Sequence, residues 1–453
     1  MTAFEQQSAT SPLGDSGLRR QLTAGQMAMV GVGGSIGTGL LLGSGAAVRI
    51  AGPAVILSFA AAALIAWTVA MALAEMASVH PSPGAFGTYA ELYLNSWAGF
   101  ISRYGFWLAI AIAIGGEMVA SATYMRYWFP RVHAIVWIAV FAAGLIAINL
   151  RTVGDYGKFE YWFAMIKLLT MLAFLVLGAA LLASGRVLPQ YTASGGFFPN
   201  GHSAPLRAMS FSLFTFAGIE MVAISSGESR SRLEVSRAVR LAFTLLTVVY
   251  MGSIVVLVGV MPWNGAGVME SPFVTVFRHV GLPAASHVMN LVVLSAALSG
   301  ANASLYADSR TLFSLAQGGY APAALGRLTT AGEPLRALLV SSFGIILALA
   351  LAKWAPQDAF VYLLGAALFG AMLAWLVVLA AHVRFRGRLS HEEKDGVTLC
   401  SPTGATASLL GFFAIVVSLA ATWWYSRVTV LSGLVYVVGL SAVYLLIRPK
   451  RHG

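Results

Sequence analysis

Apolar runs long enough to cross a membrane recur along almost the whole chain. A helix needs roughly 20 apolar residues to span the hydrocarbon core of a bilayer. We find twelve such runs, at about 27–47, 53–76, 97–124, 132–150, 158–183, 206–227, 241–261, 285–315, 335–353, 359–383, 405–424 and 428–447. Only 10% of the residues are charged and 58% are hydrophobic, which excludes an ordinary soluble domain. The sequence therefore predicts an all-α integral membrane protein with twelve transmembrane helices.

The positions of the basic residues predict which side of the membrane holds the two ends of the chain. An even number of spans places both tails on the same side. With the tails in the cytoplasm, cytoplasmic segments contain 18 lysines and arginines and external segments contain eight, an asymmetry typical of that orientation. The net charge of +11 is therefore interpreted as basic cytoplasmic loops, and no nucleic-acid partner is expected.

The loops between the runs are too short for a soluble catalytic domain, so we expect a single membrane domain. Its predicted parts are a cytoplasmic tail (1–24), a first five-helix repeat (25–187), an external loop (188–204), a second five-helix repeat (205–387), a cytoplasmic loop (388–404), two further helices (405–447) and a short cytoplasmic tail (448–453). Because five is an odd number, the second repeat is inverted in the membrane relative to the first.

The side-chain chemistry favours no enzyme, metal or cofactor. The single cysteine, Cys400, falls in a predicted loop and excludes a disulfide framework. The eight histidines show no metal-ligand spacing. We therefore expect no catalytic residues and no cofactor.

The first apolar run is interrupted by glycines. Residues 31–39 read Gly-Val-Gly-Gly-Ser-Ile-Gly-Thr-Gly, and a glycine in a helix interior costs about 1 kcal/mol relative to alanine. Lipid cannot satisfy the backbone groups that a break exposes, so a break here must face protein, water or a ligand. The alternative is close packing of helices through small residues. A phosphate-binding loop is excluded, because Leu40 stands where that motif needs lysine.

A second candidate break lies in the sixth run, around Phe214, Thr215, Phe216 and Gly218. This run begins the second repeat, as the glycine-rich run begins the first. Interrupted helices at corresponding positions of inverted repeats indicate the binding site of a transporter. Half-helix amino ends attract anionic groups and unwound carbonyls attract cations, and an amino acid presents both. A phenylalanine ring could close over such a ligand or could simply pack in the core.

Three ionisable residues lie deep in predicted spans, where a charge is costly and usually functional. Lys167 lies about nine residues into its run. It could exchange a proton, act as a fixed positive charge in place of a sodium ion, or form a static ion pair. Glu117 and Glu220 could carry protons, pair with Lys167 or contact a substrate ammonium group. Each could instead be a carboxylate hydrogen-bonded into the helix bundle.

Other polar residues in the spans are weaker candidates. Glu75, near the cytoplasmic end of the second run, is interpreted as structural. Asp308 and Arg310 are expected to form a local pair or a cytoplasmic gate. Ser295 could contact substrate or join two helices by hydrogen bonding.

Segments along most of the chain together resemble bacterial amino acid permeases of the amino acid–polyamine–organocation superfamily, in the amino acid transporter subfamily. The match runs from about Leu18 to Phe385. Its segments are GGSIGTGLLLGSG (33–45), AGPAVILS (51–58), ALAEMA (72–77), GTYAELY (87–93), YMRYWFP (124–130), FEYWFAMIKLL (159–169), GGFFPNG (195–201), FTFAGIEMVAISSGES (214–229), MPWN (261–264), SPFV (271–274), NLVVLSAALSGANASLYADSRTLFSLA (290–316) and HVRF (382–385).

The resemblance implies a leucine-transporter-like fold, with ten helices in a 5+5 inverted repeat, broken helices 1 and 6, and two extra helices. It also implies proton-coupled amino acid symport across the bacterial inner membrane by a monomer or weak dimer. By position, the substrate carboxylate would meet Ser35, Ile36, Gly37, Thr38 and Gly39. The substrate amino group would meet the backbone around Phe214, Thr215 and Phe216, with Phe216 as gate. Lys167 matches a lysine that replaces a coupling sodium ion, and Glu117 and Glu220 match acidic positions of the subfamily.

The residues expected around the substrate side chain are mostly apolar. They are Met118, Ser121, Ala122 and Ile219, with Gly218 and Ser295 also assigned to the substrate site. These residues favour a neutral or aromatic amino acid. The chain departs from many relatives at Ser35 and Ala217, which leaves the substrate open. The alternatives are an exchanger or permease for a polyamine or γ-amino acid, and an amino acid sensor that does not transport.

Overall fold

A computed structural model describes residues 23–80, 85–149, 156–185, 190–192, 195–224, 229–329, 333–389, 404–424 and 427–447. The predicted tails before residue 23 and after residue 447, Cys400 and most of the predicted 388–404 loop lie outside these residues. Helices form nearly all of the regular structure that is described. The all-α prediction is thereby confirmed.

The helices follow the order of the predicted spans. The first half contains α2 (Ala24–Ser35), η1 (Gly39–Gly43), α3 (Ser44–Ala51), η2 (Gly52–Ala54), α4 (Val55–Val79), α5 (Ala85–Tyr93), α6 (Ser96–Arg126), α7 (Ala134–Asn149) and α8 (Tyr156–Ala183). The second half contains α9 (Ala204–Thr215), α10 (Met221–Ile224), α11 (Arg232–Val260), η4 (Trp263–Gly265), α12 (Pro272–His279), α13 (Pro283–Gln317), η5 (Ala323–Gly326), α14 (Leu335–Ser341), α15 (Phe343–Trp354) and α16 (Ala359–Arg388). Two more helices follow, α18 (Ala405–Thr422) and α19 (Arg427–Ile447).

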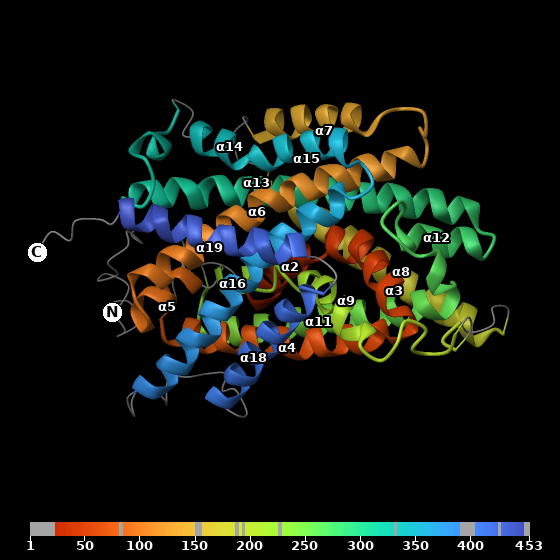
Figure 1. Ribbon diagram of the computed structural model, residues 1–453, viewed down its shortest axis with the longest axis horizontal. Helices are drawn as coiled ribbons and strands as arrows, with labels where there is room; N and C mark the ends of the chain where they lie inside the picture. Colours follow the sequence, from red (N-terminus) through yellow and green to blue (C-terminus); the bar gives the residue numbers. More distant parts are fainter. Residues whose placement is uncertain are drawn as a thin grey trace, which may run out of the picture.

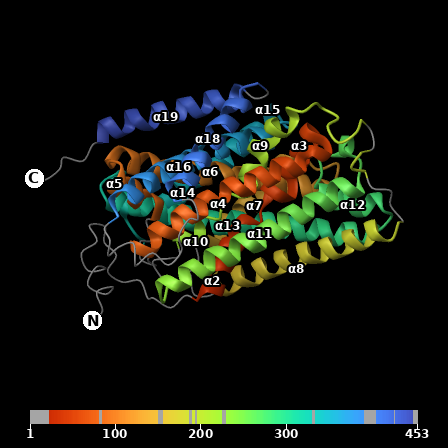
Figure 2. The same cartoon turned by 90° about the horizontal axis from the view of Figure 1, so that it is seen from below.

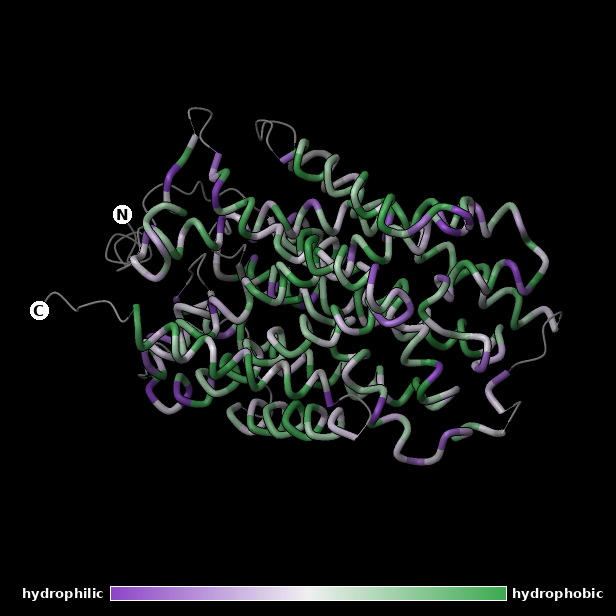
Figure 3. The backbone as a smooth tube through the Cα atoms, turned by 45° about the horizontal axis from the view of Figure 1, so that its top comes forward, coloured by the Kyte–Doolittle hydropathy of each residue, from purple (hydrophilic) through white to green (hydrophobic). Residues whose placement is uncertain are grey.

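Nine helical stretches in the described part of the chain are long and apolar enough to cross a membrane. The shorter apolar helix α7 corresponds to the predicted fourth span. The second half of the interrupted first span, Gly39–Ala51, is continuous with α4 in one of the nine stretches, and the sixth span is interrupted. The number of twelve transmembrane helices stays a prediction. Large apolar side chains face outward from the bundle, including Leu64, Val176 and Leu446 at 70%, 69% and 86% exposure. Such an apolar outer surface suits lipid rather than water. Figure 3 shows hydrophobic residues along most of the length of the bundled helices.

The long helices lie side by side along the longest axis of the molecule (Figures 1 and 2). We call the end where α2 begins and α19 finishes the tail end. There the backbone N–H of Ala24 donates to the carboxylate of Glu234, at the start of α11. The opposite end, which we call the far end, holds the connections 195–203 and 261–271.

Both predicted breaks are present, which confirms them. Helix α2 begins with a capping box formed by Thr23 and Gln26 and ends at Ser35. Residues 36–37 are not helical, and the chain resumes through the π-helical turn η1 into α3. Helix α9 ends at Thr215, residues 216–220 form turns, and α10 follows.

The helices pack in two sets around these breaks. Helix α4 packs against α9 and α11, and α11 also packs against α2. Helix α6 packs against α13, α15 and α16. Helix α16 contacts both sets, because it lies against α6 and also against α4 and α18. The space between the two sets contains the candidate site.

Candidate functional site

A cavity of about 810 Å³ lies between the two broken helices and the walls formed by α6, α8, α13 and α16. Its inner part is bordered by Gly37, Gly39 and Gly218. From there it extends to the exposed residues Gln26 and Trp162, so it opens towards the tail end.

Hydrogen bonds bridge the segments at the far end of the molecule. The side-chain amide of Asn200 donates to the carbonyl of Ile50 at 3.0 Å, and Ser271 Oγ donates to the carbonyl of Leu41 at 2.7 Å. Arg49 donates to the carbonyl of Asn264. The two loop connections are thus held against the first broken helix on the side opposite the opening of the cavity.

The two breaks touch each other, and glycine makes this possible. Gly218 has φ of +108°, and a Cβ atom there would lie 2.8 Å from Ser35 Oγ and 3.0 Å from the carbonyl carbon of Gly34. A Cβ atom on Gly39 would lie 3.1 Å from the ring of Phe214. Thr215 Oγ1 donates to the carbonyl of Gly39 at 3.3 Å. Close packing at the break is therefore one role of the glycines in the first run, and their predicted role in holding a ligand stays a prediction.

Two buried side chains satisfy backbone carbonyls at the end of α2. Lys167 Nζ, on α8, donates to the carbonyl of Gly33 at 3.3 Å, and the Lys167 residue is only 2% exposed. The hydroxyl of Tyr250, on α11, donates to the carbonyl of Ser35 at 2.7 Å. The carboxyl end of a helix carries partial negative charge, so a cation is favourable there. Lys167 thus stabilises the first half-helix at the break.

Glu117 contacts the opposite half of the same broken helix. Its Oε1 atom accepts hydrogen bonds from Thr38 Oγ1 at 3.0 Å and from the Thr38 backbone N–H at 3.4 Å. Glycines lie on both sides: a Cβ atom on Gly37 would be 3.1 Å from Oε1, and one on Gly300 would be 3.7 Å away. The carboxylate therefore lies at the amino-terminal turn of the second half-helix, a favourable position for an anion.

Glu220 has a corresponding role at the second break. Its Oε2 atom accepts hydrogen bonds from the backbone N–H of Gly218 at 3.0 Å and from Trp375 Nε1 at 3.3 Å. The first bond holds the turn between α9 and α10, and the second joins that turn to α16. Each break is therefore held by one carboxylate, which is buried in Glu220 and half-buried in Glu117.

The structure brings seven of the seventeen predicted site residues to the cavity, and Lys167 is not among the seven. Ser35, Gly37, Gly39, Phe214, Gly218, Glu117 and Glu220 line it. The other predicted substrate residues, and the predicted gate, are not among the lining residues in the described part of the chain: Ile36, Thr38, Thr215, Phe216, Ile219, Met118, Ser121, Ala122 and Ser295. Their assignment stays a prediction.

Several of these residues have definite contacts behind the cavity wall. Phe216 is fully buried, and its ring meets that of Tyr250 edge-on at 5.0 Å between centroids. Ser121 Oγ donates to the carbonyl of Glu117 and Ser295 Oγ to the carbonyl of Val292, both at 2.8 Å. In this conformation these side chains support the site rather than face its interior.

Sequence reasoning missed most of the cavity wall. Three helices each contribute two alanines spaced by four residues: Ala109 and Ala113 on α6, Ala303 and Ala307 on α13, and Ala367 and Ala371 on α16. Residues four apart lie on one helix face, so each helix presents a shallow apolar strip. The spacing was a signal in the sequence, but the same pattern also occurs where helices pack closely.

The expected pair between Asp308 and Arg310 is wrong. Arg310 pairs with Glu333 at 3.2 Å and lies over the ring of Tyr306, 3.3 Å from its centroid. Asp308 instead hydrogen-bonds Ser341. Residues two apart on a helix point in nearly opposite directions, which explains why the two side chains do not meet.

Comparison with known proteins places the chain among transporters. The sequence pattern of the family described as "Amino acid permease" matches residues 26–448. The gamma-aminobutyric acid permease of Bacillus subtilis (strain 168) is 33% identical over 446 residues, covering 96% of this chain and 95% of that protein. The aromatic amino acid transport protein AroP of Escherichia coli (strain K12) is 35% identical over 415 residues, covering 89% of this chain and 90% of that protein.

A solved structure supports the fold independently. The crystal structure of the Eremococcus coleocola manganese transporter aligns with a TM-score of 0.63 at 14% identity, over 96% of this chain and 98% of that one. At this identity the likeness concerns the fold alone, and it confirms the predicted leucine-transporter-like architecture.

Proposed function

The chain belongs to the amino acid permease family, and on this premise we propose that it imports a neutral amino acid with a large, preferably aromatic, side chain together with a proton. The family consists of membrane transporters of amino acids, not enzymes. The proposal concerns the substrate, the coupling ion and the direction of transport. Its main support is the contact between Glu117 and Thr38 at the first break.

The two breaks offer complementary groups to a zwitterion. Backbone N–H groups at the start of the second half-helix suit the substrate carboxylate, and Gly37 and Gly39 line the cavity at this turn. The turns after Phe214, together with Glu220, provide acceptors for the ammonium group. This arrangement recognises the part that all α-amino acids share.

Glu117 links substrate binding to a proton. Its carboxylate already lies at the turn where we expect the substrate carboxylate. Two unit charges of the same sign about 4 Å apart repel by about 4 kcal/mol at an effective dielectric constant of about 20. A proton on Glu117 removes this repulsion and frees Thr38 for the substrate. Substrate and proton then enter together, while Lys167 holds the other half-helix.

The alanine strips favour a large apolar side chain. Most of the residues that line the cavity are glycine, alanine or serine, which leaves room for a ring next to the breaks. Aromatic rings gain from burial and from contact with other rings. The name of the relative AroP is consistent with such a substrate.

A γ-amino acid or a polyamine is the second candidate. Glu117 and Glu220 both line the cavity, and no lysine or arginine lines it among the described residues. A longer cationic substrate could therefore reach both carboxylates. The name of the B. subtilis relative points in the same direction.

The open end of the cavity bears on which state of the transport cycle the structure represents. The cavity opens at the tail end, which the distribution of basic residues predicts to lie in the cytoplasm. The conformation is then the inward-open state of an alternating-access cycle. We also propose that the protein acts as a monomer or weak dimer.

Uptake into proteoliposomes tests the proposal. Purified protein is reconstituted, a pH gradient is imposed, and accumulation of radiolabelled L-phenylalanine is measured with each common amino acid, γ-aminobutyrate and putrescine as competitors. We expect uphill uptake that collapses with a protonophore and competition chiefly by aromatic amino acids. Chief competition by γ-aminobutyrate or putrescine would favour the second candidate, and counterflow without net uptake would identify an exchanger.

A further inference from the structure

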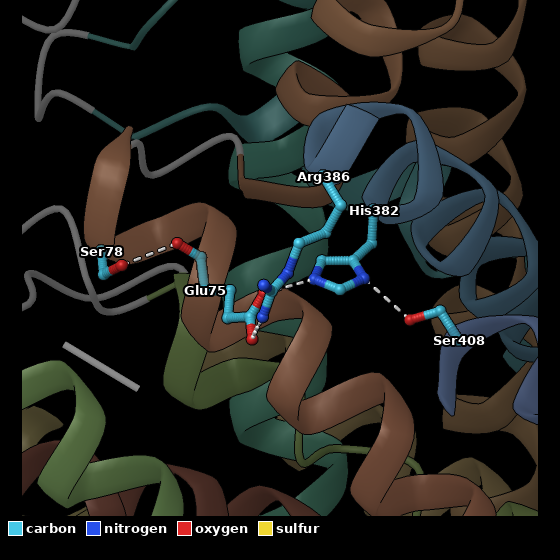
Figure 4. A network of polar contacts seen from close by, with 5 residues as sticks. All are labelled: Glu75, Ser78, His382, Arg386 and Ser408. Atoms are coloured by element: carbon cyan, nitrogen blue, oxygen red, sulfur yellow. Dashed lines mark hydrogen bonds and ion pairs between the residues drawn. The ribbon is translucent and has the colours of Figure 1, made fainter. Parts of the chain in front are cut away.

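A buried polar cluster joins α4, α16 and α18 at the tail end (Figure 4). Glu75, on α4, is fully buried and accepts hydrogen bonds on both oxygens. Arg386 Nε donates to Glu75 Oε2 at 2.7 Å and its Nη2 donates to Oε1. His382 Nε2 lies 2.6 Å from Glu75 Oε2, and His382 Nδ1 lies 2.8 Å from Ser408 Oγ. We call these four residues the Glu75 cluster.

The Glu75 cluster fixes α16 against α4. Removing a carboxylate from water costs several kcal/mol, and good geometry is needed to offset that cost. The planar guanidinium of Arg386 provides it by binding both oxygens, and the His382 ring occupies a further acceptor site on Oε2. A shift of α16 would break these contacts with the buried Glu75 carboxylate. The position of α16 along its axis and its rotation are therefore strongly constrained here.

The same face of α16 reaches the second break. Trp375, His382 and Arg386 are spaced by seven and four residues, which places them in one stripe along the helix. Ala367 and Ala371 continue the stripe along the cavity wall. Trp375 Nε1 donates to Glu220 Oε2 at 3.3 Å, and the same oxygen receives the N–H of Gly218. One rigid helix thus connects the Glu75 cluster to the turn between α9 and α10.

We propose that Glu75 is a positioning residue that acts on Glu220 through α16, by holding Trp375 where its indole N–H reaches the Glu220 carboxylate. Trp375 and Arg386 are eleven positions apart, about 16 Å along a helix. A rotation of α16 released at Arg386 would be transmitted to Trp375 and would lengthen a bond that is already 3.3 Å. The inference rests on the proposed function only in treating Glu220 as part of the substrate site.

The first test observes Trp375 directly. Protein labelled with 5-fluorotryptophan is purified in detergent, and the ¹⁹F resonance missing from Trp375→Phe is assigned to Trp375. Glu75→Gln keeps the shape of the side chain but removes its charge, and we expect it to shift the Trp375 resonance. Arg386→Lys keeps the charge but cannot bind both oxygens in a fork, so it should shift the same resonance less. If Glu75→Gln does not fold, the shift of the Trp375 resonance in Arg386→Lys tests the proposal by itself.

The second test measures coupling to substrate binding. We expect Glu75→Gln and Trp375→Phe each to raise the KM for L-phenylalanine in counterflow by about tenfold and to change kcat much less. In a double-mutant cycle the combined variant should be no worse than either single variant, because both act through one hydrogen bond. Additive losses in the double variant would overturn the proposal, as would an unmoved Trp375 resonance in both cluster variants.

Glu91→Gln is the matched control. Glu91 pairs with Arg103 at 2.8 Å and accepts a hydrogen bond from the hydroxyl of Tyr320 at 3.0 Å. Its replacement therefore weakens an ion pair and a hydrogen bond that involve neither α16 nor the Glu75 cluster. It should leave the Trp375 resonance and the KM unchanged. If Glu91→Gln shifted the Trp375 resonance as much as Glu75→Gln does, the effect of Glu75→Gln would reflect a general loss of stability rather than a specific link to Trp375. If the wild-type protein transports none of the tested compounds, the proposed function fails, yet the ¹⁹F experiment still decides whether Glu75 positions Trp375.

Discussion

The carboxylate of Glu117 accepts a hydrogen bond from the hydroxyl of Thr38 at 3.0 Å, across the space between α6 and the first broken helix. The bond places a negative charge of the protein itself at the helix amino end that is best suited to the substrate carboxylate. An arriving substrate must therefore displace this charge or meet it neutralised. This competition gives a physical reason for moving a proton with each amino acid.

We predict that Glu117→Gln uncouples transport. A neutral amide cannot repel the substrate carboxylate, so substrate should bind without a proton. With one proton per substrate, a gradient of one pH unit supports about tenfold accumulation. The variant should fall to no accumulation while it retains counterflow exchange. Both rates are measured in the same proteoliposome preparation.

The pH dependence of this variant provides a separate check. In the wild-type protein, raising the external pH removes the proton from Glu117, so the KM for substrate should rise with pH. In Glu117→Gln that rise should be absent. A rise as steep as in the wild-type protein would assign the coupling proton to another group.

We predict that Lys167→Ala abolishes accumulation driven by a pH gradient. The change removes the cation from the carboxyl end of α2 and leaves the carbonyl of Gly33 without its Lys167 bond. Accumulation in proteoliposomes is the measurement. Lys353→Ala, at the exposed end of α15, serves as control and should accumulate normally. Full accumulation by Lys167→Ala would contradict a role in coupling.

The breaks could be predicted from the sequence because their causes are local. Five glycines within residues 31–39 destabilise a helix wherever it lies, and Gly218 alone permits the positive φ of the second turn. Lys167, Glu117 and Glu220 could likewise be singled out from the sequence, because each ionisable residue lies deep within a predicted span. These features depend on residue type and on position in one segment.

The cavity wall and the Glu75 cluster depend on partners that are distant along the chain. Glu75 and Arg386 are 311 residues apart, and no local pattern indicates that they meet. In the sequence, the alanines on α6, α13 and α16 look like ordinary packing residues. Only the three-dimensional arrangement of the three helices shows that they line one cavity. The residues of α6 that were predicted to contact the substrate lie close along the helix to those that line the cavity, but on another face. Glu117 and Ala113 line the cavity, whereas Met118 and Ala122 are buried behind it.

We predict that Gly218→Ala strongly impairs transport. The backbone there has φ of +108° and the new Cβ atom would lie 2.8 Å from Ser35 Oγ. The strained backbone alone costs about 1–3 kcal/mol, and the clash separates the two breaks. Transport should fall more than about tenfold. Gly201→Ala shares a positive φ of +86° but has no atom within 4 Å of its Cβ position, so it should retain transport; equal losses in both variants would count against contact between the breaks.

The alanine strips yield a prediction about substrate size. Ala303→Leu adds three carbons to the cavity wall formed by α13, so it should exclude a large side chain and tolerate a small one. We expect the KM for L-phenylalanine to rise about tenfold while that for L-alanine stays within about threefold. Ala284→Leu makes the same change on an exposed part of α13 and should alter neither KM. Equal effects of Ala303→Leu on both substrates would show that this strip does not contact the substrate side chain, and the aromatic preference would lose its structural support.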